Sequence, residues 1–199
     1  ASRKRSYVGL GVCALLLCAF IALCFGIGAA VSEDEAVNRA FGIWESDVSV
    51  ELVSDEVEAE EVRGAIEEVA PISHEWLEGA YMLNLDGAAR TFLGLSDPSV
   101  LDESSLIEGR MPRQSNEVMV GLNLARSQDL SVGDELVIAD PSGQEKTLIA
   151  CGVVSSVLNG GDGAFLTFEG LQRLVGDGLE DAGRTRQYQL EDAEKVDAV

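Results

Sequence analysis

Histidine and cysteine are scarce in this sequence of 199 residues. There is one histidine, His74, and of the four cysteines three (Cys13, Cys18 and Cys24) lie in one apolar segment, leaving Cys151 alone in the rest of the chain. Without a C-x-x-C pair or a second histidine, the usual zinc, haem and iron–sulfur ligand sets are incomplete. A single cysteine in the body of the chain also excludes a disulfide framework there. We therefore expect no metal site and no cofactor.

Basic residues are scarce as well. The sequence has 14 Lys and Arg against 35 Asp and Glu, a formal net charge of −21 at pH 7. Such a chain repels phosphates, so we expect no nucleic-acid partner. It also lacks the G-x-x-x-x-G-K-[ST] phosphate loop and a G-x-G-x-x-G after a strand, which leaves nucleotide binding without support. The hydrophobic content of 46% is high enough for a folded core.

Catalytic groups are equally limited. His74 is the only histidine that could serve a serine or cysteine nucleophile, and a structural or surface role is the favoured interpretation of it. Cys151 lies between Ala150 and Gly152 in an apolar strand, where a small buried side chain is expected, and no basic neighbour would lower its thiol pKa. We expect no catalytic residues and no enzyme. A membrane-tethered hydrolase stays the least favoured alternative.

A long uncharged run near the N-terminus predicts a membrane span. Residues 7–31 are 25 residues without a charge, which as a helix would extend roughly 37 Å against a hydrocarbon core of about 30 Å. The basic residues 3–5 precede it, so residues 1–6 are predicted to be a cytoplasmic flank and the main domain to be extracytoplasmic. The alternative is a cleavable secretory signal with small residues at 28–30, but the run is long for a signal core.

After the span, the pattern predicts a β-α-β unit. Residues 32–35 form a capping box, which indicates a stalk helix over 32–46. Residues 47–53 alternate in the two-residue period of a half-buried strand. A second capping box at 55–58 precedes Val62, Ile66 and Val69, an amphipathic helix that Pro71 ends. Residues 74–85 are predicted to be a strand or hairpin, which completes a split, ferredoxin-like β-α-β unit.

The middle of the chain is rich in short strands and turns. We predict a strand over 117–120, one or two helical turns around 122–125 that Gly133 ends, and a hairpin of residues 135–139 and 144–154 around a type I turn at 140–143. A strand followed by a short helix is predicted over 165–175, and a further strand over 184–190. Residues 193–199 open a helix whose following strand is absent, so we expect the sequence to be a piece of a longer protein.

The segment 107–154 carries a set of linked motifs. In order, they are Gly109-Arg110 with Pro112, Asn116-Glu117-Val118, Leu124-Ala125, Leu130, Val132-Gly133-Asp134 and a strand that ends in Gly152-Val153. In this order and spacing, behind an N-terminal span and a first β-α-β unit, they resemble the extracytoplasmic core domain of FtsX-like (MacB-type) ABC transporter permeases. The resemblance covers essentially the whole chain.

The resemblance implies a permease subunit whose first transmembrane helix leads into a large outer domain. Its partners would be membrane lipid, an ABC ATP-binding subunit and a second permease subunit, and its cargo a peptide, a lipoprotein or a drug. The motif residues would have structural roles. Gly109 and Gly133 would form turns, Pro112 would add rigidity, and Arg110 and Asp134 would tie loops together; Leu124 and Leu130 would lie in the core of a lobe.

Together these interpretations predict an α+β protein in the cell membrane. A cytoplasmic flank (1–6), a transmembrane helix (7–31) and a stalk helix (32–46) would precede the outer domain. That domain would combine a β-α-β subdomain (47–85 with 184–199) and an inserted β-rich lobe (86–183). The predicted function is the N-terminal part of an ABC permease that couples cytoplasmic ATP hydrolysis to movement of the outer domain. The alternative is a single-span or secreted ligand-binding module.

Overall fold

The computed structural model describes residue 20 and residues 46–51, 59–101, 103–156, 158–176 and 184–192. Apart from residues 20 and 46, the predicted membrane span and stalk helix lie outside the described residues, as does the helix predicted to open at residue 193. Within the described ranges, no helix has the length and apolar character needed to cross a bilayer.

The described part of the chain is built on one nine-stranded sheet with few helices, which confirms a mixed α+β protein. Eight strands follow the order β1-β9-β2-β3-β8-β5-β7-β4, and β6 pairs with β7 beside this path. The strands are β1 Val48–Glu51, β2 Ile72–Leu85, β3 Ala88–Leu95, β4 Leu106–Gly109, β5 Glu117–Gly121, β6 Glu135–Ala139, β7 Glu145–Val154, β8 Ala164–Thr167 and β9 Arg184–Leu190. The α-helices are α3 Ala59–Val69, α4 Leu122–Ser127 and α5 Phe168–Val175, and short 3₁₀ turns are η1 Pro98–Val100, η2 Glu103–Ser105 and η3 Leu158–Gly161.

The first unit of the sheet joins segments from the two ends of the domain. Strand β9 lies between β1 and β2 and is antiparallel to both, so β1 and β2 run in the same direction with α3 connecting them. Ile66 and Ala70 pack against Tyr188 and Leu190 of β9. The predicted strand at 184–190 and the predicted helix before Pro71 are thus confirmed. A complete ferredoxin-like unit would need residues beyond 192, and it stays a prediction.

Strand β2 continues past this unit and turns back as β3. Asp86 and Gly87 have φ values of 51° and 81°, the pair of positive φ angles that a tight two-residue hairpin turn requires. Asn84 Oδ1 accepts a hydrogen bond from Gly87 N at 2.8 Å and helps to fix the turn. The predicted boundary between residues 85 and 86 falls in this turn, and the sheet continues across it. The division into subdomain and lobe stays a prediction.

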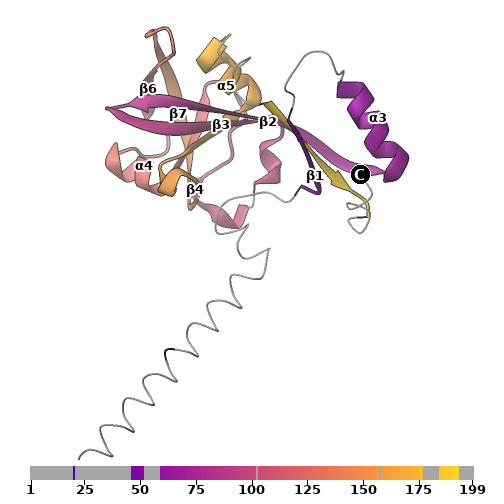
Figure 1. The fold of residues 1–199 in the computed structure, drawn as a ribbon. Coiled ribbons are helices and arrows are strands. Elements are labelled where there is room, and N and C mark those ends of the chain that lie inside the picture. Colours follow the sequence, from indigo (N-terminus) through magenta and orange to yellow (C-terminus); the bar gives the residue numbers. More distant parts are fainter. Residues whose placement is uncertain are drawn as a thin grey trace, which may run out of the picture. The chain divides into compact units, whose positions relative to one another are not determined.

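The central strands are buried on both faces. Side chains from β3, β5 and β8 alternate between two apolar clusters, because successive residues of a strand point to opposite faces. One cluster lies between the sheet and helices α4 and α5, and it includes Phe92, Val118, Val120, Leu124, Leu166, Leu171 and Leu174. The other includes Trp76, Leu93, Leu95, Met119, Cys151 and Phe165. In Figure 1, α4 and α5 lie toward the β6–β7 end of the sheet, whereas α3 lies beside the β1 end.

The predicted hairpin of β6 and β7 is confirmed, with Ala139 opposite Glu145 across the turn. The end of helix α4 differs from the prediction. The helix ends at Ser127, because Asp129 adopts a left-handed conformation (φ 52°) and Leu130 N donates back to Ala125 O at 2.9 Å. This is a Schellman-type cap in which Leu130 also packs on the core. Gly133, with φ 100°, instead turns the chain into β6.

Candidate functional site

The motif Gly109-Arg110 lies where strands β4 and β7 approach each other most closely. Arg110 N donates a hydrogen bond to Cys151 O at 2.9 Å. A Cβ atom on Gly152 would come within 2.5 Å of Arg110 O, and one on Gly109 would come within 2.8 Å of Gly152 Cα. Gly109 also has φ 79°, a conformation that other residues rarely adopt. Both glycines are therefore required for the chain to leave β4 at this point.

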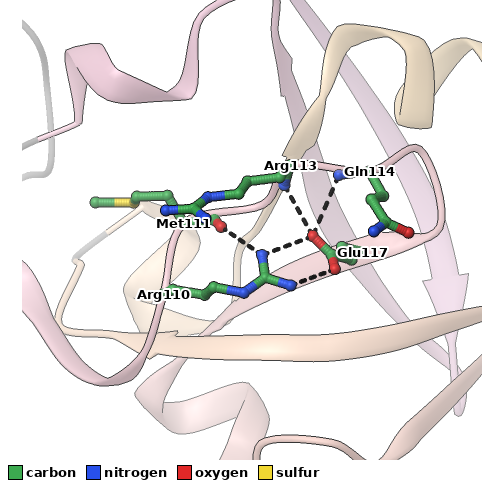
Figure 2. A network of polar contacts seen from close by, with 5 residues as sticks. All are labelled: Arg110, Met111, Arg113, Gln114 and Glu117. Carbon is green, nitrogen blue, oxygen red and sulfur yellow. Dashed lines mark hydrogen bonds and ion pairs between the residues drawn. The ribbon is translucent and has the colours of Figure 1, made fainter.

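The chain between β4 and β5 is folded around one carboxylate (Figure 2). Both terminal nitrogens of the Arg110 guanidinium donate to Glu117: Nη1 lies 2.8 Å from Oε2, and Nη2 donates to Oε1. Nη1 also donates to Met111 O at 3.1 Å. The backbone N–H groups of Arg113 and Gln114 donate to the same Oε2 at 2.8 and 3.2 Å. Glu117 thus closes a corner formed by residues 110–117.

The electrostatics of this corner follow from burial. The Glu117 side chain is 9% exposed, whereas that of Arg110 is 43% exposed. The hydrogen bonds from Arg110, with those from the two backbone N–H groups, lower the pKa of Glu117 from 4.5 to about 2. A buried carboxylate without such donors would instead favour its neutral form. Glu117 is therefore a charged anchor at any physiological pH.

The corner forms one wall of an open groove of about 850 Å³. Other walls come from the β3–η1 loop, from η2 and from the junction of β8 with α5. The lining residues are Ser96, Asp97, Pro98, Ser99, Glu103, Leu106, Gly109, Arg110, Met111, Pro112, Arg113, Thr167, Phe168 and Glu169. The groove therefore gathers segments that lie far apart in the sequence, from Ser96 to Glu169. It is the candidate functional site of the described region.

The β3–η1 wall is held by three polar contacts. Asp97 Oδ1 accepts a hydrogen bond from Ser99 N at 2.9 Å, and Asp97 Oδ2 lies 3.1 Å from His74 Nε2 on β2. The hydrogen bonds from Ser99 hold the pKa of the Asp97 carboxyl below its usual value, and His74 adds to this effect. Ser96 Oγ accepts from Leu77 N at 2.8 Å. His74 therefore contacts the wall of the groove that Asp97 forms.

Cys151 and Asp134, two further residues considered in the sequence analysis, lie in strand β7 and directly before strand β6, respectively. Cys151 is buried and forms no disulfide, and burial raises the pKa of its thiol to about 11, which favours the protonated form at neutral pH. Asp134 Oδ2 accepts from Ser131 N at 2.8 Å, and Asp134 O accepts from Ala150 N at 2.9 Å. Arg110 and Asp134 each hold a loop of their own: Arg110 pairs with Glu117, and Asp134 holds the turn before β6 through Ser131. No group of three or more potential metal-ligating side chains is found among the described residues.

The sequence did not identify the groove or the central role of Glu117. Glu117 was visible only as part of the Asn116-Glu117-Val118 motif. Its position seven residues after Arg110 is compatible with many loop conformations, so the spacing alone does not indicate an ion pair. A glutamate at the start of an otherwise apolar strand is the one available signal, since charged residues are seldom buried without a partner.

Comparison with known proteins supports this fold. No protein-family model matches the sequence, and no curated protein sequence is significantly similar. Among solved structures, the extracellular domain of the noncanonic ABC-type transporter YknZ from Gram-positive bacteria is similar with a TM-score of 0.51 and 14% identity. The match covers 76% of this chain and 88% of that domain. The chain has the fold of this ABC-transporter domain, so the resemblance indicated by the motifs is confirmed at the level of the fold.

A second solved structure is more distantly similar. It is the periplasmic region of MacB from Actinobacillus actinomycetemcomitans, with a TM-score of 0.43 and 13% identity. That match covers 65% of this chain and 63% of the MacB region, so the chain spans less than two thirds of it.

Proposed function

We propose that the chain is the N-terminal part of an ABC transporter permease, with its described region as an extracytoplasmic domain. The observation that carries this proposal is the fold shared with the YknZ extracellular domain over most of both chains. The motifs of residues 107–154 add support, because in the structure they form the β4–β5 corner, the turn into β6 and the strand β7. These are structural features of one domain.

In this role the domain would transmit movement rather than perform chemistry. A partner ATP-binding subunit would hydrolyse ATP in the cytoplasm, and the outer domain would change position in response. Residues 7–31 would be the membrane span that joins the two sides, with the N-terminus in the cytoplasm. A pair of permease subunits would form the transporter. Within this proposal the chain has no enzymatic activity of its own.

The test is to isolate the intact parent protein from its own membranes in mild detergent, identify the proteins that accompany it and assay ATP hydrolysis. Co-purification of an ATP-binding subunit with ATP turnover is the expected result. A protein that emerges without such a partner, under conditions that preserve other membrane complexes, would contradict the proposal. It would favour the alternative, a single-span or secreted ligand-binding module.

A further inference from the structure

Three apolar side chains that line the groove also pack against the core. Leu106 and Met111 pack against the cluster around Trp76, and Phe168 packs against the cluster on the opposite face of the sheet. All three are only partly buried, and all three line the groove. Pockets that bind organic ligands have volumes of roughly 300–1,000 Å³ and are mainly apolar with a few placed polar groups. The groove has a volume in this range, and it combines these apolar side chains with polar and charged ones.

Two of the charges in the groove are already committed to other side chains. Arg110 forms the ion pair with Glu117, and Asp97 interacts with His74 and Ser99. Both residues shape the walls. The Glu117 carboxylate offsets the charge of Arg110, whereas the hydrogen bonds to Asp97 lower the pKa of that carboxyl and leave it anionic.

Three further charged side chains in the groove form no ion pair with another described residue. Glu103 and Glu169 are exposed, and neither forms an ion pair with another residue of the described ranges. The Arg113 side chain is also exposed, and within the same ranges it forms no ion pair. The uncommitted charge is therefore negative, on a chain whose formal net charge is −21. Both the local and the overall field favour a cationic ligand.

We propose that this groove binds a basic peptide segment that carries large apolar side chains. The apolar side chains would cover Leu106, Met111 and Phe168, and the basic side chains would face Glu103 and Glu169 at the rim. A peptide with both apolar and basic side chains fits an open groove that has separate apolar and acidic surfaces, because each kind of side chain can then contact the matching surface. This site goes beyond the proposed permease function and does not depend on it, since binding requires no ATP-binding subunit.

The test uses the full chain in nanodiscs of zwitterionic lipid and a fluorescently labelled Ac-Lys-Leu-Lys-Phe-Lys-amide as the probe. Fluorescence anisotropy is expected to show saturable binding that weakens as salt is raised. The charge-inverted peptide with Glu in place of Lys, and the peptide with Ser in place of Leu and Phe, are both expected to bind at least tenfold more weakly. Equal binding of the charge-inverted peptide, or no binding of the basic one, would overturn the proposal.

Charge variants in the protein locate the site and give effects of opposite sign. The double change Glu103→Gln and Glu169→Gln should weaken binding of the basic peptide by about two- to tenfold, the range for two exposed charge pairs. Arg113→Gln removes a positive charge that would repel the basic peptide, so this variant should bind the peptide more tightly. Glu60→Gln with Glu61→Gln on α3 is the matched control, which makes the same change in net charge on exposed residues outside the groove.

If the control pair weakens binding as much as the groove pair, the peptide responds to net charge alone and the site is not the groove. If Arg113→Gln weakens binding, the basic peptide does not lie beside Arg113 as the proposal requires, and the groove is not its site. Neither result bears on co-purification with an ATP-binding subunit, so failure of the groove and failure of the permease proposal are distinguishable.

Discussion

At the scale of single residues, Glu117 closes the corner formed by residues 110–117. Its side chain is only 9% exposed, yet its carboxylate accepts four hydrogen bonds from three residues of the same corner. Removing one member of a buried pair leaves the other charge or the backbone donors without partners, and this costs more than the pair itself contributes. The corner is therefore sensitive to the charge of one side chain.

The Glu117→Gln variant should be less stable at neutral pH by about 1–3 kcal/mol, since an amide cannot satisfy the guanidinium and both N–H groups. The pKa of Glu117 is about 2 in the folded chain against an ordinary value of 4.5. Its contribution to stability is thus complete above pH 4.5 and is lost as the pH falls toward 2. Urea unfolding of the full chain in detergent across this range should show a shallower acid dependence in the variant.

Glu145→Gln, on the exposed face of β7, is the control for this experiment. It should leave both the neutral-pH stability and the acid dependence close to those of the parent chain. An acid dependence in Glu117→Gln as steep as in the parent chain would show that Glu117 does not anchor the corner.

Backbone proximity gives a second prediction at the residue scale. In Gly152→Ala, the added Cβ would lie 2.5 Å from Arg110 O and 3.1 Å from Glu108 O, both backbone atoms that cannot rotate away. Strands β4 and β7 would have to separate, and we expect a loss of about 1–3 kcal/mol. Urea unfolding measures it, and an unchanged midpoint would mean that the close approach of the two strands is not maintained in solution.

At the scale of elements, the sheet and its helices differ in how they use glycine. Gly94 of β3 lies under α5, where a Cβ would come within 2.6 Å of Leu171 Cβ, so that helix can pack only on a bare backbone. Gly64 of α3 is exposed and a Cβ there would meet nothing within 4 Å. The same residue type is thus a packing requirement in one element and an entropic weakness in another.

Gly64→Ala should therefore stabilise the chain by about 0.5–1 kcal/mol, because alanine restricts the unfolded backbone and favours the helix. Gly94→Ala is the contrasting variant and should destabilise it. Circular dichroism during urea unfolding distinguishes the two. A Gly64→Ala variant with reduced stability would indicate that α3 has a partner on this face or is not a helix there.

At the scale of the whole molecule, the acidic charge of the chain disfavours binding of ATP. ATP carries several negative charges, which a chain with net charge −21 repels, and the sequence contains no phosphate-loop motif. In the proposed transporter the nucleotide belongs to the partner subunit. Titration of fluorescent ATP with magnesium into the full chain should therefore give no saturable binding, while saturation would contradict this division of roles.

The sequence by itself determined most of the local elements of this protein. The strand prediction for residues 184–190, the helical spacing of Val62, Ile66 and Val69, and the turn at 140–143 each match an element that the structure contains. The motifs of residues 107–154 also indicated the fold. These signals are local, so a short segment contains all the information that they require.

Tertiary structure alone decided strand β3, the ion pair of Glu117 and the groove. Residues Phe92–Leu95 are buried on both faces, so β3 lacks the alternation of a half-buried strand, and only the Asp86-Gly87 turn before it was a usable signal. The partners of Glu117 and the walls of the groove depend on which strands lie side by side. That order follows from packing between segments far apart in the chain, as when β9 enters between β1 and β2.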